Sequence, residues 1–113
     1  LARANRVQCV TTARDYIDAH LGESLAIDTL ARACGVSPRT LEYAFREIFD
    51  TSPLRYIKTR RLHAIRRRLK ETDKGATSVT EIALSHGFNH LGYFARDYHA
   101  LFGEHPSQTL TRD

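Results

Sequence analysis

The chain has 113 residues, the usual length of one domain, and 42% of them are hydrophobic, so we expect a buried core. No apolar run approaches the roughly 18 residues that a membrane-spanning helix needs, and we recognise no signal peptide, so we expect no membrane partner. The sequence lacks methionine and starts at Leu1, which indicates a piece of a longer protein. Cys9 and Cys34 form no C-x-x-C pair, and we favour two buried thiols over a disulfide.

Positive charge is concentrated in one segment. The net charge is +4, with 17 Lys and Arg against 13 Asp and Glu. Residues 55–70 hold eight of the basic residues and no acidic one, which leaves nine basic and 13 acidic residues, a net charge of −4, in the rest of the chain. Fourteen of the 17 basic residues are Arg, the type suited to bidentate phosphate contacts. The segment is either an ordinary solvated face or an electrostatic footprint for nucleic acid.

Apolar residues recur at helical spacing throughout, and no segment of five residues alternates in the manner of a strand. The spacing predicts seven helices, over about residues 6–21, 27–34, 38–49, 53–71, 78–87 and 89–102 and after Pro106. The expected N-caps are Ser37, Ser52, Ser78 (in a capping box with Glu81) and Asn89. The residues expected on buried faces are Val7, Val10, Ala13, Ile17, Leu21, Leu41, Ala44, Phe45, Ile48, Phe49, Leu54, Ile57, Leu62, Ile65, Leu69, Leu91, Phe94, Tyr98, Leu101 and Phe102.

One structural unit occurs twice. It consists of a short helix, a turn of three or four residues with a glycine, and a longer helix, which is the helix-turn-helix pattern. The matching residues are Leu30, Ala31, Gly35, Leu41, Phe45, Phe49, Asp50 and Pro53 in the first copy and Ile82, Ala83, Gly87, Phe94, Tyr98, Phe102, Gly103 and Pro106 in the second. A generic helical hairpin is the alternative, which the double occurrence disfavours.

We therefore predict an all-α, seven-helix domain over residues 1–113. Two homeodomain-like helix-turn-helix subdomains, at about residues 7–52 and 78–110, are joined by a long basic linker helix at about 53–71. At ~1.5 Å per residue this linker is about 28 Å long, close to the ~34 Å between successive major-groove faces of B-DNA. Such a helix would allow a single chain, without a dimer, to place two reading helices in adjacent major grooves.

Three stretches carry a family resemblance: LARACGVSPRTLEYAF (30–45), YIKTRRLHAIRRRL (56–69) and VTEIALSHGFNHLGYFARDYHALFGEHP (79–106). The third contains I-A-x3-G-F, Y-F-x-R and F-G-x-x-P. In these motifs the chain resembles the DNA-binding domain of the AraC/XylS family of bacterial transcription regulators, over about residues 7–110. The resemblance implies seven helices, two helix-turn-helix units, control of transcription in the bacterial cytoplasm at the nucleoid, and a separate N-terminal effector or dimerisation domain.

The sequence departs from the family at several positions. Asp50 stands where a glycine is common, and Leu91 and Gly92 occupy positions that are often polar. The ending PSQTL lacks an aromatic residue often found there. These departures affect the second reading helix more than the fold.

The candidate DNA contacts come from the exposed sides of the two longer helices and the linker. On a helical wheel for residues 38–49, Arg39 and Tyr43 point away from the apolar face, and Arg39 is suited to guanine O6 and N7. Glu42 either accepts from a cytosine amino group or pairs with Arg46. The candidate base-reading residues are Arg39, Glu42, Tyr43, Asn89, His90, Gly92, Tyr93 and Arg96. The candidate phosphate contacts are Thr40, Arg46, Arg55, Lys58, Arg60, Arg66, Arg67 and His99. The exposed face of the second reading helix offers few base-reading groups, and we expect the first reading helix to discriminate sequence more strongly.

No catalytic, cofactor or metal motif is recognised, and we expect no enzyme activity. His86 and His90 are four residues apart, but Gly87 interrupts the helix between them. The leading hypothesis is a sequence-specific binding domain for double-stranded DNA, with RNA polymerase as a further partner. The alternative is a helical protein-interaction module that docks RNA polymerase or a partner domain. An RNA-binding helical domain or a small enzyme is a third reading.

Overall fold

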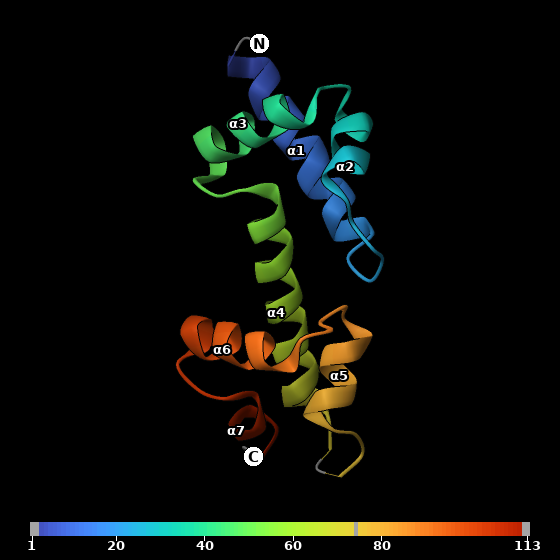
Figure 1. Cartoon of the computed structure of the whole chain (residues 1–113), viewed down its shortest axis with the longest axis vertical. Coiled ribbons are helices and arrows are strands. Elements are labelled where there is room, and N and C mark those ends of the chain that lie inside the picture. Colours follow the sequence, from blue (N-terminus) through green and yellow to red (C-terminus); the bar gives the residue numbers. More distant parts are fainter. Residues whose placement is uncertain (1–2, 74, 112–113) are drawn as a thin grey trace. The chain divides into compact units, whose positions relative to one another are not determined.

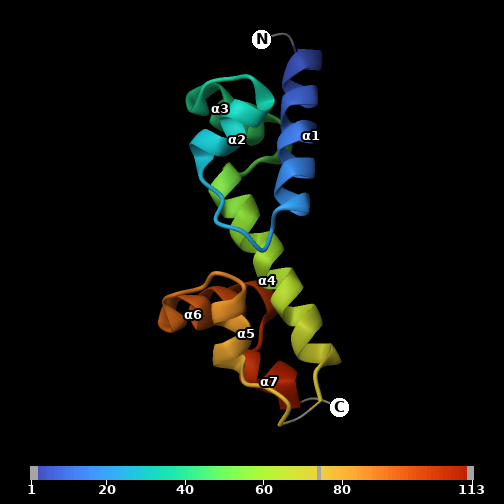
Figure 2. The same cartoon turned by 90° about the vertical axis from the view of Figure 1, so that its right-hand side faces the viewer.

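The computed structural model describes residues 3–73 and 75–111, and within them α-helices, joined by turns and loops, are the only regular secondary structure (Figures 1 and 2). The seven helices of this part are α1 (Arg3–Ala19), α2 (Ile27–Cys34), α3 (Pro38–Phe49), α4 (Pro53–Glu71), α5 (Val79–Ser85), α6 (Leu91–Phe102) and α7 (Pro106–Thr111). The predicted all-α fold with seven helices is confirmed. None of these helices combines the length and the apolar character needed to cross a membrane.

Contacts divide the chain into two compact units, Leu1–Arg60 and Arg61–Asp113, so that α4 contributes to both. In the first unit α1, α2 and α3 pack on one another (Figure 1). In the second unit α5, α6 and α7 contact each other beside the second half of α4 (Figure 2). Each unit has its own cluster of buried side chains. The boundary between the two units lies inside α4, the helix that we predicted to be the linker. The subdomain limits at residues 52 and 78 stay a prediction.

The core of the first unit is formed where the apolar stripes of its helices meet. Its buried residues are Cys9, Val10, Ala13, Ile17, Leu30, Ala31, Leu41, Ala44, Phe45 and Ile57. The prediction that Val7 belongs to this face was wrong, because Val7 lies on the flank of the α1 stripe and is 40% exposed. The predicted helix end was also too late: α1 ends at Ala19, and Leu21 packs against the core from the following turn.

The turn before α3 directs that helix through backbone geometry. Gly35 adopts a left-handed conformation, with φ 69°, and ends α2. Ser37 then caps α3 as predicted, since its Oγ accepts a hydrogen bond from the Thr40 N–H at 3.2 Å. At the far end Asp50 is left-handed, with φ 55°, a conformation that Asp tolerates better than most residues but that glycine adopts more easily. The family resemblance had pointed to this position.

The second unit also has a buried core and capped helices, but its capping residues differ from those of the first unit. Its buried cluster consists of Leu62, Ile65, Leu69, Ile82, Ala83, Phe94 and Tyr98. Ser78 caps α5 as predicted, because its Oγ accepts from the Glu81 N–H at 3.1 Å, but the Glu81 carboxylate accepts from the Thr77 hydroxyl at 2.6 Å instead of completing the predicted capping box. The short helix α7 is tied to α6 by a buried hydrogen bond of 2.7 Å between the hydroxyls of Tyr98 and Thr109.

Three predictions about this unit were wrong, two of them about the ends of helices. The N-cap of α6 is His90, one residue later than the predicted Asn89, and α6 begins at Leu91. Helix α5 ends at Ser85, with His86 as its C-cap, instead of continuing to Gly87. Because α6 begins at Leu91, that side chain is at the open end of the core face, where it is 39% exposed and lines a hollow with Val79 and Pro106.

Two other leucines expected in the core are exposed. Leu101 is 42% exposed, because the buried stripe of α6 follows Phe94 and Tyr98 and leaves Leu101 on its flank. Leu54 is 56% exposed in the first turn of α4, where Pro53 and Ile57 occupy the buried side instead.

Candidate nucleic-acid interface

The exposed face of α3 carries four polar side chains around one hollow. Arg39, Glu42, Tyr43 and Arg46 line this hollow, whose volume is about 500 Å³. All four are exposed, and the Tyr43 ring is 61% exposed although it is large and aromatic. Because Leu41, Ala44 and Phe45 anchor the opposite side of the helix, the chain holds this polar face towards solvent. The four residues that the helical wheel grouped together do lie together.

Within this hollow the Arg39 side chain is already oriented. Its Nη2 donates a hydrogen bond to the Tyr43 hydroxyl at 3.3 Å, and its Cζ lies 5.6 Å from the centre of the Tyr43 ring. One turn of helix separates the two residues, which is the spacing at which side chains meet on a helix surface. A guanidinium has five N–H donors, so one bond to Tyr43 leaves the others for a ligand.

The sequence left open whether Glu42 pairs with Arg46. In the described part of the chain no ion pair joins them, whereas Arg6 of α1 holds the next acidic residue, Glu47, at 2.7 Å. Thr40 is half-buried at the helix start, where its Oγ1 accepts a hydrogen bond from the Ser37 hydroxyl at 3.0 Å. Glu42 and Arg46 thus stay exposed, while Thr40 takes part in the capping of α3.

The exposed face of α6 has a different organisation, because its side chains stack. The rings of His90 and Tyr93 lie 4.0 Å apart with an angle of 25° between their planes. The Arg96 guanidinium lies 4.8 Å from the centre of the Tyr93 ring and 3.9 Å from the Asp97 carboxylate. Sequence analysis identified His90, Tyr93 and Arg96 as separate candidate contacts and did not predict that they stack on one another. Their spacing of three residues is the signal that could have revealed the stack.

The remaining candidates on the second unit are simpler. Asn89 and Gly92 are exposed at the start of α6. His99, one turn beyond Arg96, stacks on His105 with their ring centres 4.6 Å apart. His99 therefore has a partner within its own unit before any ligand binds.

The structure separates the basic residues of α4 into two groups. Arg55, Lys58 and Arg67 are exposed. Arg60 pairs with Asp18 of α1 at 3.1 Å and keeps a side-chain exposure of 42%. Arg66 is half-buried, with its Cζ 4.7 Å from the centre of the Phe102 ring.

Two further arginines of α4 support the fold of the second unit. Arg68 donates to the Ser85 hydroxyl at 3.0 Å. Arg61 lies against the turn at Gly87, where its Nη1 would be 3.5 Å from an added Cβ, and burial lowers the pKa of its guanidinium. The charge run therefore contains both solvent-facing and structural residues, and composition alone does not distinguish them.

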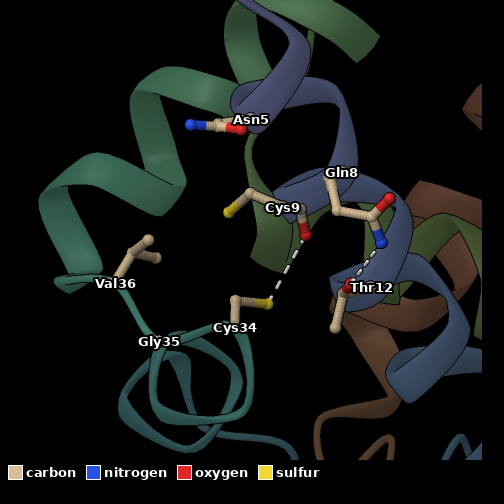
Figure 3. A pocket seen from close by; sticks show the side chains of 7 residues that line it. All are labelled: Asn5, Gln8, Cys9, Thr12, Cys34, Gly35 and Val36. Carbon is tan, nitrogen blue, oxygen red and sulfur yellow. Dashed lines mark hydrogen bonds between the residues drawn. The ribbon is translucent and has the colours of Figure 1, made fainter. Parts of the chain in front are cut away.

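A second hollow in the first unit contains both cysteines (Figure 3). It has a volume of about 270 Å³ and is lined by Asn5, Gln8, Cys9, Thr12, Cys34, Gly35 and Val36. Both cysteines are free thiols; Cys9 is buried as expected, whereas Cys34 is only half-buried. The Cys34 Sγ donates to the Cys9 carbonyl oxygen at 3.5 Å, which fixes the end of α2 on α1.

Burial makes the Cys34 thiol a weak nucleophile. Desolvation first, and the neighbouring Cys9 second, raise its pKa from 9.0 to about 11. Since the thiolate is the reactive form, at about pH 8 we expect iodoacetamide to alkylate Cys34 about 100-fold more slowly in the folded chain than in denaturant. The rate in the folded chain should rise steeply as the pH approaches 11. Mass spectrometry of proteolytic peptides measures each cysteine separately, and equal rates in folded and denatured chain would contradict the expectation.

Two helix-turn-helix units, each with one buried and one exposed face on its longer helix, define a helix-turn-helix protein. In agreement, the family described as a helix-turn-helix domain matches residues 30–112. The chain is 42% identical over 97 residues, 86% of its length, to the XylDLEGF operon transcriptional activator 3 of Pseudomonas putida. It covers 29% of that relative, and similarly small shares of several other curated relatives.

Solved structures give the same result. A probable AraC family transcriptional regulator from Rhodopseudomonas palustris is 38% identical, with a TM-score of 0.88 over 93% of this chain and 96% of that chain. The DNA-binding domain of AdpA, solved in complex with a target DNA, is 26% identical, with a TM-score of 0.72 over 85% of this chain and 84% of that chain. The chain belongs to the AraC/XylS family of transcriptional regulators and corresponds to the family's DNA-binding domain.

Proposed function

We propose that this domain controls transcription by binding one operator sequence with α3 and α6 inserted into adjacent major grooves. The observation that carries the proposal is the polar face of α3, where Arg39, Glu42, Tyr43 and Arg46 surround one exposed hollow opposite a buried apolar face. The first turns of such a helix are the part that contacts base edges in helix-turn-helix complexes. This face combines hydrogen-bond donors with an acceptor. Such a combination suits the major groove, where each base pair presents its own pattern of hydrogen-bond donors and acceptors.

The linker supports the use of two grooves. Helix α4 continues without a break from Pro53 to Glu71, and 19 residues at ~1.5 Å make about 28 Å, comparable with the ~34 Å repeat of the major groove. We assign phosphate contacts to its exposed Arg55, Lys58 and Arg67, and smaller contributions to Arg60, which pairs with Asp18, and to Arg66, which lies over the Phe102 ring. The DNA complex of the AdpA domain, a relative with the same fold, supports the choice of ligand.

The test is selection from a library of random-sequence duplex DNA, followed by titration of the recovered duplex at several salt concentrations. We expect one recovered consensus, and affinity that falls about 10³- to 10⁵-fold between 50 and 200 mM salt if about six to ten phosphates are contacted. Recovery of no consensus, or binding insensitive to salt, would refute the proposal. It would favour the alternative, a helical module that docks a protein.

Two further partners belong to this proposal. The relatives named as operon activators, of which this chain covers about 29%, support RNA polymerase as a partner of the DNA-bound protein. They also support a separate effector or dimerisation domain in the intact regulator. Binding to an operator would place the domain at the nucleoid of a bacterial cytoplasm.

A further inference from the structure

The N-cap of α6 has a chemical consequence beyond ending the helix. The Nδ1 atom of His90 accepts a hydrogen bond from the backbone N–H of Tyr93 at 3.2 Å. A nitrogen that accepts a hydrogen bond carries no proton, so the network assigns the proton of the neutral ring to Nε2. His90 therefore has a fixed tautomer, with one donor and no remaining acceptor.

The ring is also held in place by its neighbours. One face of the imidazole stacks on Tyr93, with 4.0 Å between ring centres, and Tyr93 in turn lies under the Arg96 guanidinium. Gly92 lies beside the ring: a Cβ at that position would be 3.4 Å from the His90 Cε1 and 3.6 Å from its Nδ1. A glycine is unfavourable inside a helix, and here it leaves the flank of the ring uncovered.

The Nε2–H group of His90 donates no hydrogen bond to any residue in the part of the chain that the structure describes. His90 is exposed. A serine or an asparagine, which are among the preferred N-cap residues, would accept the same backbone hydrogen bond. Capping alone thus does not require a ring whose second nitrogen points to solvent.

We propose that His90 is a specificity-determining residue of the second reading helix, whose Nε2–H donates to a base in the major groove and excludes cytosine there. Guanine offers O6 and N7, adenine N7 and thymine O4 as acceptors, whereas cytosine presents an amino donor. Two donors facing each other make no hydrogen bond, so cytosine is the base rejected. This inference rests on the proposed function, because it concerns the same DNA interface.

The test compares His90→Asn with the unaltered chain on the consensus duplex recovered by selection and on duplexes substituted at each position. Asparagine is among the best N-caps, so the thermal midpoint is expected to stay the same or rise slightly. Affinity for the consensus should fall about 3- to 10-fold, the value of one hydrogen bond. At one base pair under α6, the variant should lose its discrimination against cytosine.

The matched control is His20→Asn, which removes another imidazole, one that stacks on Tyr16 in the first unit and has no part in the interface. It should leave affinity and base preference unchanged. If His90→Asn keeps full discrimination at every position, or weakens all sequences equally as loss of a phosphate contact would, the inference is overturned. If the unaltered chain selects no duplex, the proposed function itself fails, and the two failures are distinct.

Discussion

Replacing Phe45 by alanine is expected to destabilise the first unit by about 3–5 kcal/mol, the usual cost of removing a buried phenyl ring. Phe45 is fully buried in α3, on the face opposite the proposed DNA contacts. Its ring centre lies 5.3 Å from that of Phe49 and 5.8 Å from that of Tyr56, so the substitution also removes two edge-to-face contacts. Neither neighbour is fully buried.

Chemical denaturation followed by residue-resolved NMR measures this effect, because signals from each unit report its own unfolding. Tyr43→Ala is the matched control: it removes an aromatic side chain from the same helix, but one that is 61% exposed, and should change the stability by less than about 0.5 kcal/mol. A loss below about 1 kcal/mol in Phe45→Ala would mean that α3 is not anchored through this side chain.

The fold could be predicted from the sequence wherever one helix face is strongly apolar. In α3 the spacing of Leu41, Ala44 and Phe45 gave the buried side, and Ser37 gave the first turn. Predictions failed on the flanks of the apolar stripes, as at Val7 and Leu101, and at the ends of helices. Leu91 is on the correct side of α6 but at its first residue, so no neighbouring element covers it fully.

The candidate site was predictable to a similar extent. A helical wheel groups Arg39, Glu42 and Tyr43 because all three belong to one short helix. It does not reveal that Arg60 pairs with Asp18, 42 residues away in the chain, or that Arg66 covers Phe102. Such pairings depend on how separate helices pack against one another. Counting the charges along a single helix gives no information about that packing.

Replacing Arg39 by alanine is expected to weaken binding to the selected duplex by about 1–3 kcal/mol, or roughly 5- to 150-fold, and to relax the preference at one base pair. The proposed reason is that its guanidinium, which donates to the Tyr43 hydroxyl at 3.3 Å, pairs with guanine O6 and N7 through two parallel hydrogen bonds. Arg39→Lys should lose most of the same discrimination, since an ammonium keeps the charge without the planar fork.

The matched control for Arg39→Ala is Arg55→Ala, which removes an exposed arginine from the start of α4. A phosphate contact carries no sequence information, so Arg55→Ala should weaken all duplexes alike and reduce the salt slope by about 1. Titration of the consensus and of every single-base substitution, each at several salt concentrations, separates the two outcomes. If both variants gave the same sequence-independent loss, these assignments of base reading and phosphate contact would be wrong. If base substitutions under α6 cost more than those under α3, the expectation that α3 discriminates sequence more strongly would be wrong.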